Sequence, residues 1–186
     1  DQSFAVFFLN AEKKIYGRFG TRSHRTEWFG DVSLKGMAAA MQGALALHQS
    51  QARIEQTLEA KRGPKPDFAS PELYPSLKDK YTDTINYEGD VVKSCIHCHQ
   101  IGDAQRDLYR SNGKPLPESL LFPYPHPKSI GLILDPDQRA NVLEVRPNTP
   151  AANAGFKSGD RIVSLSAQPL LSIADVQWVL HHTPAT

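Results

Sequence analysis

The stretch PNTPAANAGFKSGDRIVSL, residues 147–165, carries the strongest structural signal in the chain. Thr149 can cap a short helix that ends at Gly155, a residue type that commonly follows the last helical turn. The tripeptide Ser158-Gly159-Asp160 is typical of a turn. Arg161–Leu165 then contains β-branched and apolar residues, which predict a strand. This stretch therefore predicts a helix, a turn and a strand in close succession.

Further short elements flank this stretch on both sides. Before it, the apolar runs Ile130–Leu134 and Asn141–Val145 each predict a short strand. After it, Ser172 can cap another helix. The apolar residues of that helix recur at helical spacing and form one stripe: Ile173, Val176, Val179 and Leu180.

Together these elements resemble a PDZ domain of the bacterial type. The resemblance covers residues 128–186 and is carried by Gly131-Leu132 and by residues 147–152, 154–160 and 172–176. It implies a PDZ-like β-sandwich or barrel with two helices, in which an extended peptide adds as a strand to a sheet edge. The family has a further strand after the last helix, so we expect either that this sheet lacks its last strand or that the missing residues lie beyond this segment.

The resemblance also implies where a peptide binds. The carboxylate of a protein C-terminus would meet backbone N–H groups near Gly131, because glycine lets successive N–H groups converge on an anion. The residues implied for the loop and the edge strand are Ile130, Gly131, Leu132 and Ile133. On the facing helix, Ala174, Trp178 and His181 would shape the pocket for the last side chain. Core packing is the alternative role for Trp178.

Residues 1–62 predict a separate α/β unit. Phe4–Leu9 is an unbroken apolar run, which predicts a strand buried on both faces, and Ile15–Phe19 predicts its hairpin partner. Ser33 can cap a helix whose apolar residues continue to Leu58. This order resembles the second half of a thioredoxin-like domain. A generic hairpin followed by a helix is the alternative interpretation.

Residues 63–127 form an irregular, proline-containing segment around Cys95-Ile96-His97-Cys98-His99. The pattern Cys-x-x-Cys-His is typical of covalent c-type haem attachment. Cys95 and Cys98 would form the thioethers, and His99 would bind the iron from one side. The motif resembles that of cytochromes c, and Gln100–Arg110 predicts a helix after it.

The second axial ligand of such an iron is open at the level of sequence. Met37 and Met41 both precede the motif, so the downstream methionine of small cytochromes c is excluded and a histidine is the better candidate. His126 lies in a stiff proline loop and His181 lies on the final helix, and both rank above His48. A five-coordinate iron is a further alternative.

Two other interpretations use the same cysteines. Cys95 and Cys98 could be a redox dithiol, because helix N-termini and nearby histidines lower thiol pKa values. With His99 and a remote histidine they could instead bind zinc.

The composition narrows the class of protein. The chain has 186 residues, and 21 Lys and Arg stand against 20 Asp and Glu, a formal net charge of +1. This balance argues against nucleic-acid binding, and no apolar run is long enough to span a membrane. We also find no complete hydrolase constellation among its Ser, His and Asp residues, and we assign no catalytic residue.

We therefore expect an α+β multidomain protein with boundaries near residues 62 and 127. Haem c is attached outside the bacterial cytoplasm, so we expect a periplasmic or otherwise exported protein. The expected function is electron transfer or redox sensing coupled to binding of a protein C-terminus or extended peptide, with a redox protein as a further partner. The alternatives are a thiol–disulfide or protein quality-control factor and a zinc-stabilised interaction module.

Overall fold

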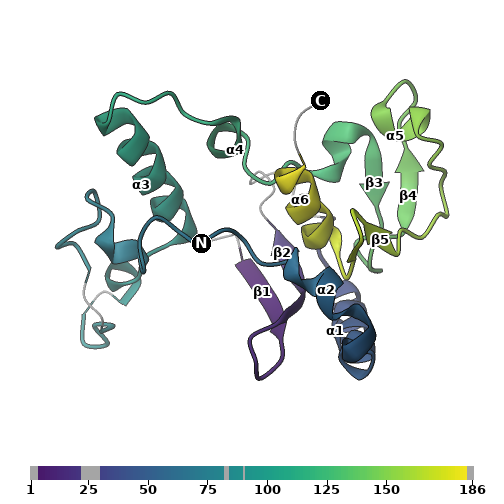
Figure 1. Ribbon diagram of the computed structural model, residues 1–186, viewed down its shortest axis with the longest axis horizontal. Helices are drawn as coiled ribbons and strands as arrows, with labels where there is room; N and C mark the ends of the chain where they lie inside the picture. The colour runs from purple at the N-terminus through teal and green to yellow at the C-terminus, as the bar shows by residue number, and fades with distance from the viewer. Residues whose placement is uncertain (1–3, 22–29, 82–83, 90, 184–186) are drawn as a thin grey trace. The chain divides into compact units, whose positions relative to one another are not determined.

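The computed structural model describes residues 4–21, 30–81, 84–89 and 91–183. The chain divides into two compact units, one made of Asp1–Gly63 with Tyr124–Thr186 and the other of Pro64–Pro123 (Figure 1). The described residues form a mixed α+β structure with small two-stranded sheets. The mixed α+β class expected from the sequence is therefore confirmed, and each unit is described by itself below.

The first unit begins with an antiparallel hairpin of β1 (Phe4–Leu9) and β2 (Ile15–Thr21). Its turn is closed by the Asn10 side chain, which accepts a hydrogen bond from the backbone N–H of Lys14 at 2.8 Å. The expectation that the first strand is buried on both faces is wrong. Phe7 and Leu9 are about half exposed, 49% and 52%, although the Arg18 guanidinium lies 5.5 Å from the centroid of the Phe7 ring.

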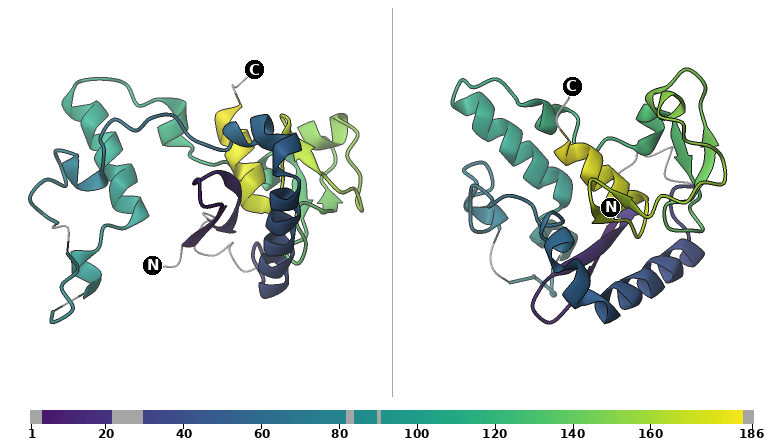
Figure 2. Two further views of the ribbon diagram at one scale, coloured as in Figure 1. Left: turned by 60° about the horizontal axis from the view of Figure 1, so that its bottom comes forward. Right: turned by 45° about the vertical axis from the view of Figure 1, so that its right-hand side comes forward.

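The helix expected after Ser33 is two helices, α1 (Leu34–Gln49) and α2 (Gln51–Glu59). The Ser33 hydroxyl accepts a hydrogen bond from the Gly36 N–H at 2.9 Å, which confirms the predicted cap. Ser50 interrupts the helical run, because its backbone leaves the helical region between the two helices. Helix α1 packs on β2 (Figure 2).

The same unit contains the elements predicted around residues 147–165. A 3₁₀ turn precedes two short strands, a short helix, a second strand pair and a final helix. These are η3 (Pro127–Ile130), β3 (Leu132–Leu134), β4 (Val142–Val145), α5 (Pro150–Asn153), β5 (Ser164–Leu165), β6 (Gln168–Pro169) and α6 (Ile173–His182). The strand predicted for Arg161–Leu165 is shorter, and β6 was not predicted. Within the described residues, β3–β4 and β5–β6 are separate strand pairs and not one sandwich or barrel.

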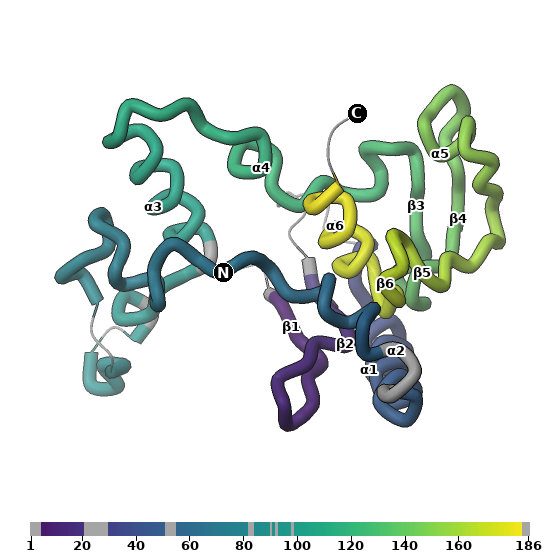
Figure 3. Tube along the Cα trace, viewed as in Figure 1, coloured from purple at the N-terminus to yellow at the C-terminus, as the bar shows by residue number. Residues whose placement is uncertain are grey.

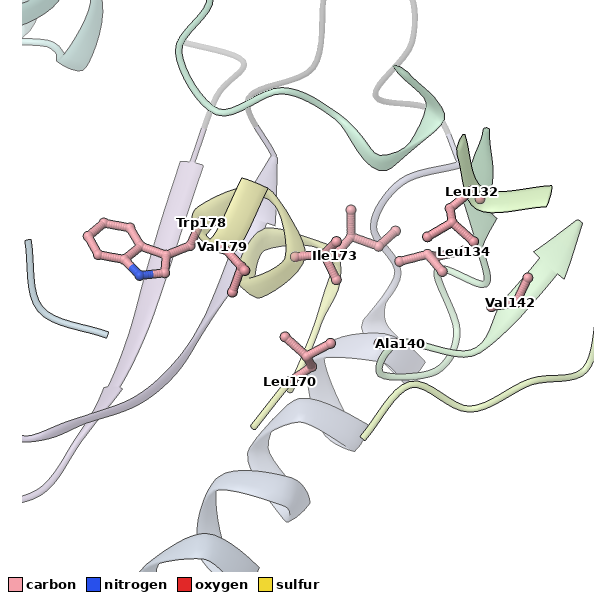
Figure 4. Close-up of a cluster of buried hydrophobic side chains, with 10 residues drawn as sticks. Leu132, Leu134, Ala140, Val142, Leu170, Ile173, Trp178 and Val179 are labelled. Carbon is pink, nitrogen blue, oxygen red and sulfur yellow. The ribbon is translucent and has the colours of Figure 1, made fainter. Parts of the chain in front are cut away.

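Helix α6 lies between the β1–β2 hairpin and the β3–β4 pair (Figure 1). Its apolar stripe packs into a buried cluster with both strands of the β3–β4 pair. The labelled members in Figure 4 are Leu132, Leu134, Ala140, Val142, Leu170, Ile173, Trp178 and Val179. Ser172 caps the helix as predicted, since its hydroxyl accepts from the Ala174 N–H at 3.0 Å.

A buried charge cluster joins the hairpin to α6. The Asp175 carboxylate lies 2.9 Å from Lys61 Nζ and 3.8 Å from Arg18 Nη1. It also accepts hydrogen bonds from the backbone N–H groups of Arg18 at 3.2 Å and Leu171 at 2.9 Å. Burial lowers the pKa of Lys61 and of Arg18, and the Asp175 charge opposes this shift in both. Residues far apart in sequence thus share one desolvated carboxylate.

The second unit contains the Cys-x-x-Cys-His motif. Its elements are η1 (Pro71–Leu73), η2 (Val91–Ser94), α3 (Cys98–Ser111) and α4 (Glu118–Leu121), and Figure 3 shows their path in teal and green. A small core of Tyr74, Leu77 and Ala104 holds the segment to α3. The predicted helix after the motif is confirmed, and it begins earlier and ends later than expected.

Candidate functional site

Strand β3 has a single strand partner in the described part of the chain, β4. At one end of the pair, the Arg146 N–H donates to the Gly131 carbonyl at 2.9 Å. At the other end, the Asp135 N–H donates to the Asn141 carbonyl at 2.9 Å. Gly131 and Asp135 therefore both direct hydrogen-bonding groups toward β4.

The backbone N–H and C=O groups of the residues between Gly131 and Asp135 point alternately toward β4 and away from it. In an antiparallel pair, residues that exchange ladder hydrogen bonds alternate with residues whose N–H and C=O groups point to the opposite edge. The backbone groups of Leu132 and Leu134 accordingly point away from β4, whereas the Leu132 and Leu134 side chains are buried in the core. One edge of β3 therefore presents two sets of backbone donors and acceptors.

A glycine turn leads into this edge. Gly131 has a φ of +90°, a conformation that L-residues with a side chain adopt at a cost. A Cβ atom at this position would lie 2.1 Å from Thr149 Oγ1, so a side chain has no room. The Gly131 N–H donates back to the Lys128 carbonyl at 3.2 Å. The Gly131 N–H is therefore occupied, and the next amide, the Leu132 N–H, points to the open edge.

Polar side chains of α6 hold the chain that enters this turn. Gln177 Nε2 donates to the Tyr124 carbonyl at 3.2 Å, and His181 Nδ1 accepts from the Tyr124 N–H at 3.3 Å. The His181 and Tyr124 rings also stack, with their centroids 4.2 Å apart. His181, implied as a groove residue or iron ligand, is thus in contact with Tyr124. Gln177 was not predicted, although it lies one turn after Ile173 on the same helix.

Trp178 lies on the hairpin side of α6 (Figure 4). Its side chain is 7% exposed, and its Nε1 donates to the Ala60 carbonyl at 3.0 Å. The Arg18 guanidinium lies over the indole, with Cζ 3.6 Å from the ring centroid. The structure therefore gives Trp178 a packing role, the alternative that the sequence left open. Ala174, the other residue implied on this helix, is half-buried.

The PDZ family model matches residues 125–185. This segment is a PDZ domain. No match was found among curated proteins or among solved structures. A PDZ domain indicates binding of a peptide or protein, and the open edge of β3 beside Gly131 is where the sequence analysis expected it. The matched range does not include the cysteine motif or the hairpin, so the thioredoxin-like interpretation of residues 1–62 stays a prediction.

The cysteine motif lies at the start of α3. The Gln100 side chain accepts a hydrogen bond from the His97 N–H at 2.7 Å, which begins the helix at Cys98. Cys95 precedes the helix, is half-buried and forms no disulfide. His99 is exposed on the first turn, and its ring stacks on His97 with centroids 5.6 Å apart. The Cys98 side chain lies outside the described part of the structure.

The residues present fit a covalently attached haem. Cys95 offers a free thiol and His99 offers an exposed imidazole, while Ile96 and Ile101 are half-buried and pack on the small core of this unit. Among the described side chains, no group of three or more His, Cys, Asp and Glu residues could hold a metal ion.

The two candidate second iron ligands belong to the other compact unit. His126 Nδ1 accepts from the Lys128 N–H at 3.2 Å, and its Nε2 lies 3.3 Å from the buried Asp31 carboxylate. Both ring nitrogens of His126 therefore have partners within their own unit. His48, ranked below it, contacts the Tyr16 hydroxyl through Nδ1 at 2.7 Å.

Proposed function

We propose that this protein binds an extended peptide at the open edge of β3 and carries a c-type haem on the cysteine motif. The observation that supports peptide binding is the pair of outward-directed backbone positions, Leu132 and Leu134, directly after the Gly131 turn. A peptide strand added there would complete their hydrogen bonds. On α6, the half-buried Ala174 and His181 would border its last side chain.

The cysteine motif is the proposed site of the haem. Cys95 and Cys98 hold the macrocycle, His99 binds its iron, and the bound haem supplies reversible one-electron transfer. Cys98 and His99 begin α3, and Cys95 lies in the irregular segment just before it, so the three residues fall within five positions of the chain. Attachment of this group implies an exported protein, and electron transfer or redox sensing coupled to peptide binding is the proposed role.

No described helix is long and apolar enough to cross a membrane. The proposed partners are a peptide ligand, which the PDZ match supports, and a redox protein.

Backbone hydrogen exchange gives a position-specific test of strand addition. We expect the amides of Leu132 and Leu134 to exchange rapidly in the free protein and at least tenfold more slowly with a saturating peptide, because the added strand would occupy them. The Ile133 amide faces β4 and should change little. Protection that is uniform along β3, or absent, would contradict peptide addition at this edge.

The glycine turn gives a second test with a matched control. We expect Gly131→Ala to weaken binding of a C-terminal peptide at least tenfold, because its Cβ would displace Thr149 and the turn. Gly159 has a similar φ of +88° but open space around its Cβ position. Gly159→Ala should therefore carry the backbone cost, about 1 kcal/mol, and leave the affinity unchanged.

Peptides with an amidated C-terminus test recognition of the carboxylate on the wild-type protein. A fluorescence-anisotropy array of peptides with free C-termini should include binders that lose most of their affinity when the same peptide is amidated. Equal binding of free and amidated forms would exclude carboxylate recognition by the loop.

A further inference from the structure

A pocket of about 260 Å³ lies between the middle of α1 and the loop that joins β3 to β4. Gln42 and Gly43 form part of the helix wall. The opposite wall is polar and contains Gln138, Arg139, Asn141 and Arg161. The pocket combines two guanidinium groups with three side-chain amides and contains no acidic side chain.

The two arginines have no carboxylate partner among the described residues. Arg139 is half-buried, and its pKa is lowered first by desolvation and then by the nearby charge of Arg161. Arg139 and the exposed Arg161 thus line one pocket that has no acidic lining residue, an arrangement that an anion would stabilise.

The acidic side chains of the same loop have partners other than the two arginines. The Asp135 carboxylate accepts from the Asp137 N–H at 2.9 Å and from the Gln138 side chain at 3.2 Å. The Asp137 carboxylate lies 3.5 Å from Lys35 Nζ. Neither carboxylate lines the pocket, although Asp135 contacts it through Gln138.

The position of Arg139 is fixed by its close packing on α1. A Cβ atom at Gly43 would lie 2.9 Å from Arg139 Nη1 and 2.7 Å from Leu171 Cδ2. The absence of a side chain at Gly43 thus lets the guanidinium rest against the helix. On the loop, Asn141 Nδ2 donates to Gln138 Oε1 at 2.7 Å, which holds the two amides in place. The donors are therefore organised before a ligand arrives.

We propose that this pocket binds a carboxylate group of an acidic ligand, either a free small dicarboxylate or an acidic side chain of a bound protein. Planar guanidinium groups match the two oxygens of a carboxylate. The pocket is lined by the middle of α1 and not by its N-terminus, where free backbone N–H groups would favour phosphate. The site uses other residues than the Gly131 turn and does not rest on the proposed function.

The test is a titration of the full chain with succinate, followed by nuclear magnetic resonance at constant ionic strength. We expect saturable shifts of the Gly43 and Asn141 backbone amides and of the Gln138 side-chain amide, and none with neutral succinamide. Arg139→Gln and Arg161→Gln should each weaken succinate at least tenfold. Lys157→Gln, which removes one exposed charge outside the pocket, should not.

Further arms identify the source of the carboxylate. An acidic peptide with an amidated C-terminus that binds at least tenfold more tightly than succinate, with the same shifted amides, indicates a protein ligand, and the reverse order indicates a free dicarboxylate. Shifts confined to Gly131 and Leu132, tighter binding of inorganic phosphate, or unchanged affinity in both arginine variants would overturn the proposal.

A gain-of-charge variant keeps the proposal testable if an arginine variant unfolds. Gln42→Glu places a carboxylate beside the pocket. We expect a higher melting temperature than wild type and no residual succinate shift, because the new side chain would occupy the guanidinium groups. A Gln42→Glu protein that still binds succinate with wild-type affinity would contradict the assignment.

Discussion

The variant Asp175→Asn is expected to lose about 3–5 kcal/mol of folding free energy, because removing one partner of a buried ion pair leaves uncompensated charge. Asp175 is 1% exposed and Lys61 is fully buried, so water cannot replace the carboxylate. The amide would retain the shape of the side chain and lose the charge that balances Lys61 and Arg18. Urea-induced unfolding followed by circular dichroism measures the loss.

A matched control distinguishes the effect of removing this buried carboxylate from the effect of removing an exposed one. Asp137 also pairs with a lysine, Lys35, but the pair is solvent-exposed. Asp137→Asn should change the unfolding free energy far less than Asp175→Asn does, because surface ion pairs contribute little. If Asp175→Asn were as mild as Asp137→Asn, the buried cluster would not hold α6 to the hairpin.

The pH dependence of stability gives the cluster a second signature. Burial lowers the folded-state pKa of Lys61 below that of the unfolded chain. Between these two pKa values the unfolded state binds more protons, so the contribution of Lys61 to stability rises with pH through that window. It is lost again as the pH falls through the lowered pKa. Lys61→Met should remove this slope, as measured by urea unfolding at a series of alkaline pH values.

The elements that the sequence predicts well are those set by local chemistry. Ser33, Thr149 and Ser172 each accept the capping hydrogen bond expected of them, because an N-cap depends only on residues two or three positions away. The helix that begins at Cys98 is likewise predictable from the local sequence. The PDZ domain is recognisable because its turn residues are close together in sequence.

Burial and long-range pairing are not predictable in the same way. The alternation of exposed and covered residues in β1 depends on which element packs on each face, and an apolar run alone does not specify it. Asp175 lies on α6, Lys61 follows the end of α2, and Arg18 lies on β2, and no spacing rule connects them. The pocket arginines were missed for the same reason, since Gly43 becomes informative only when Arg139 lies against it.

The second prediction with a large expected effect is that haem is bound covalently to the cysteine motif. Protein produced in the periplasm with intact haem-maturation machinery should exceed the polypeptide mass by one haem. Its Soret band should survive acid–acetone extraction, because thioether bonds hold the macrocycle. In Cys95→Ser/Cys98→Ser the band and the added mass should both be lost. His97→Ala is the matched control in the same segment, because His97 lies between the cysteines and is assigned no ligand role.

Substitution of single histidines distinguishes covalent attachment of the haem from ligation of its iron. His99→Ala should shift the absorption spectrum, because the imidazole bonded to iron is removed while Cys95 and Cys98 can still hold the ring. A spectral shift in His126→Ala or His181→Ala would identify the second axial ligand. No shift in either variant would favour a five-coordinate iron or a ligand from elsewhere in the chain.

Other results with the same preparation would favour one of the alternative interpretations of the cysteine motif over haem. A colourless protein with the bare polypeptide mass would exclude haem. If its thiols cycled with a reductant, Cys95 and Cys98 would be a redox dithiol, since exchange requires an accessible thiolate. If it held one equivalent of zinc that Cys95→Ser abolished, the motif would be a structural metal site. Because the open edge of β3 shares no residue with the motif, Leu132 and Leu134 should be protected by peptide in all three cases.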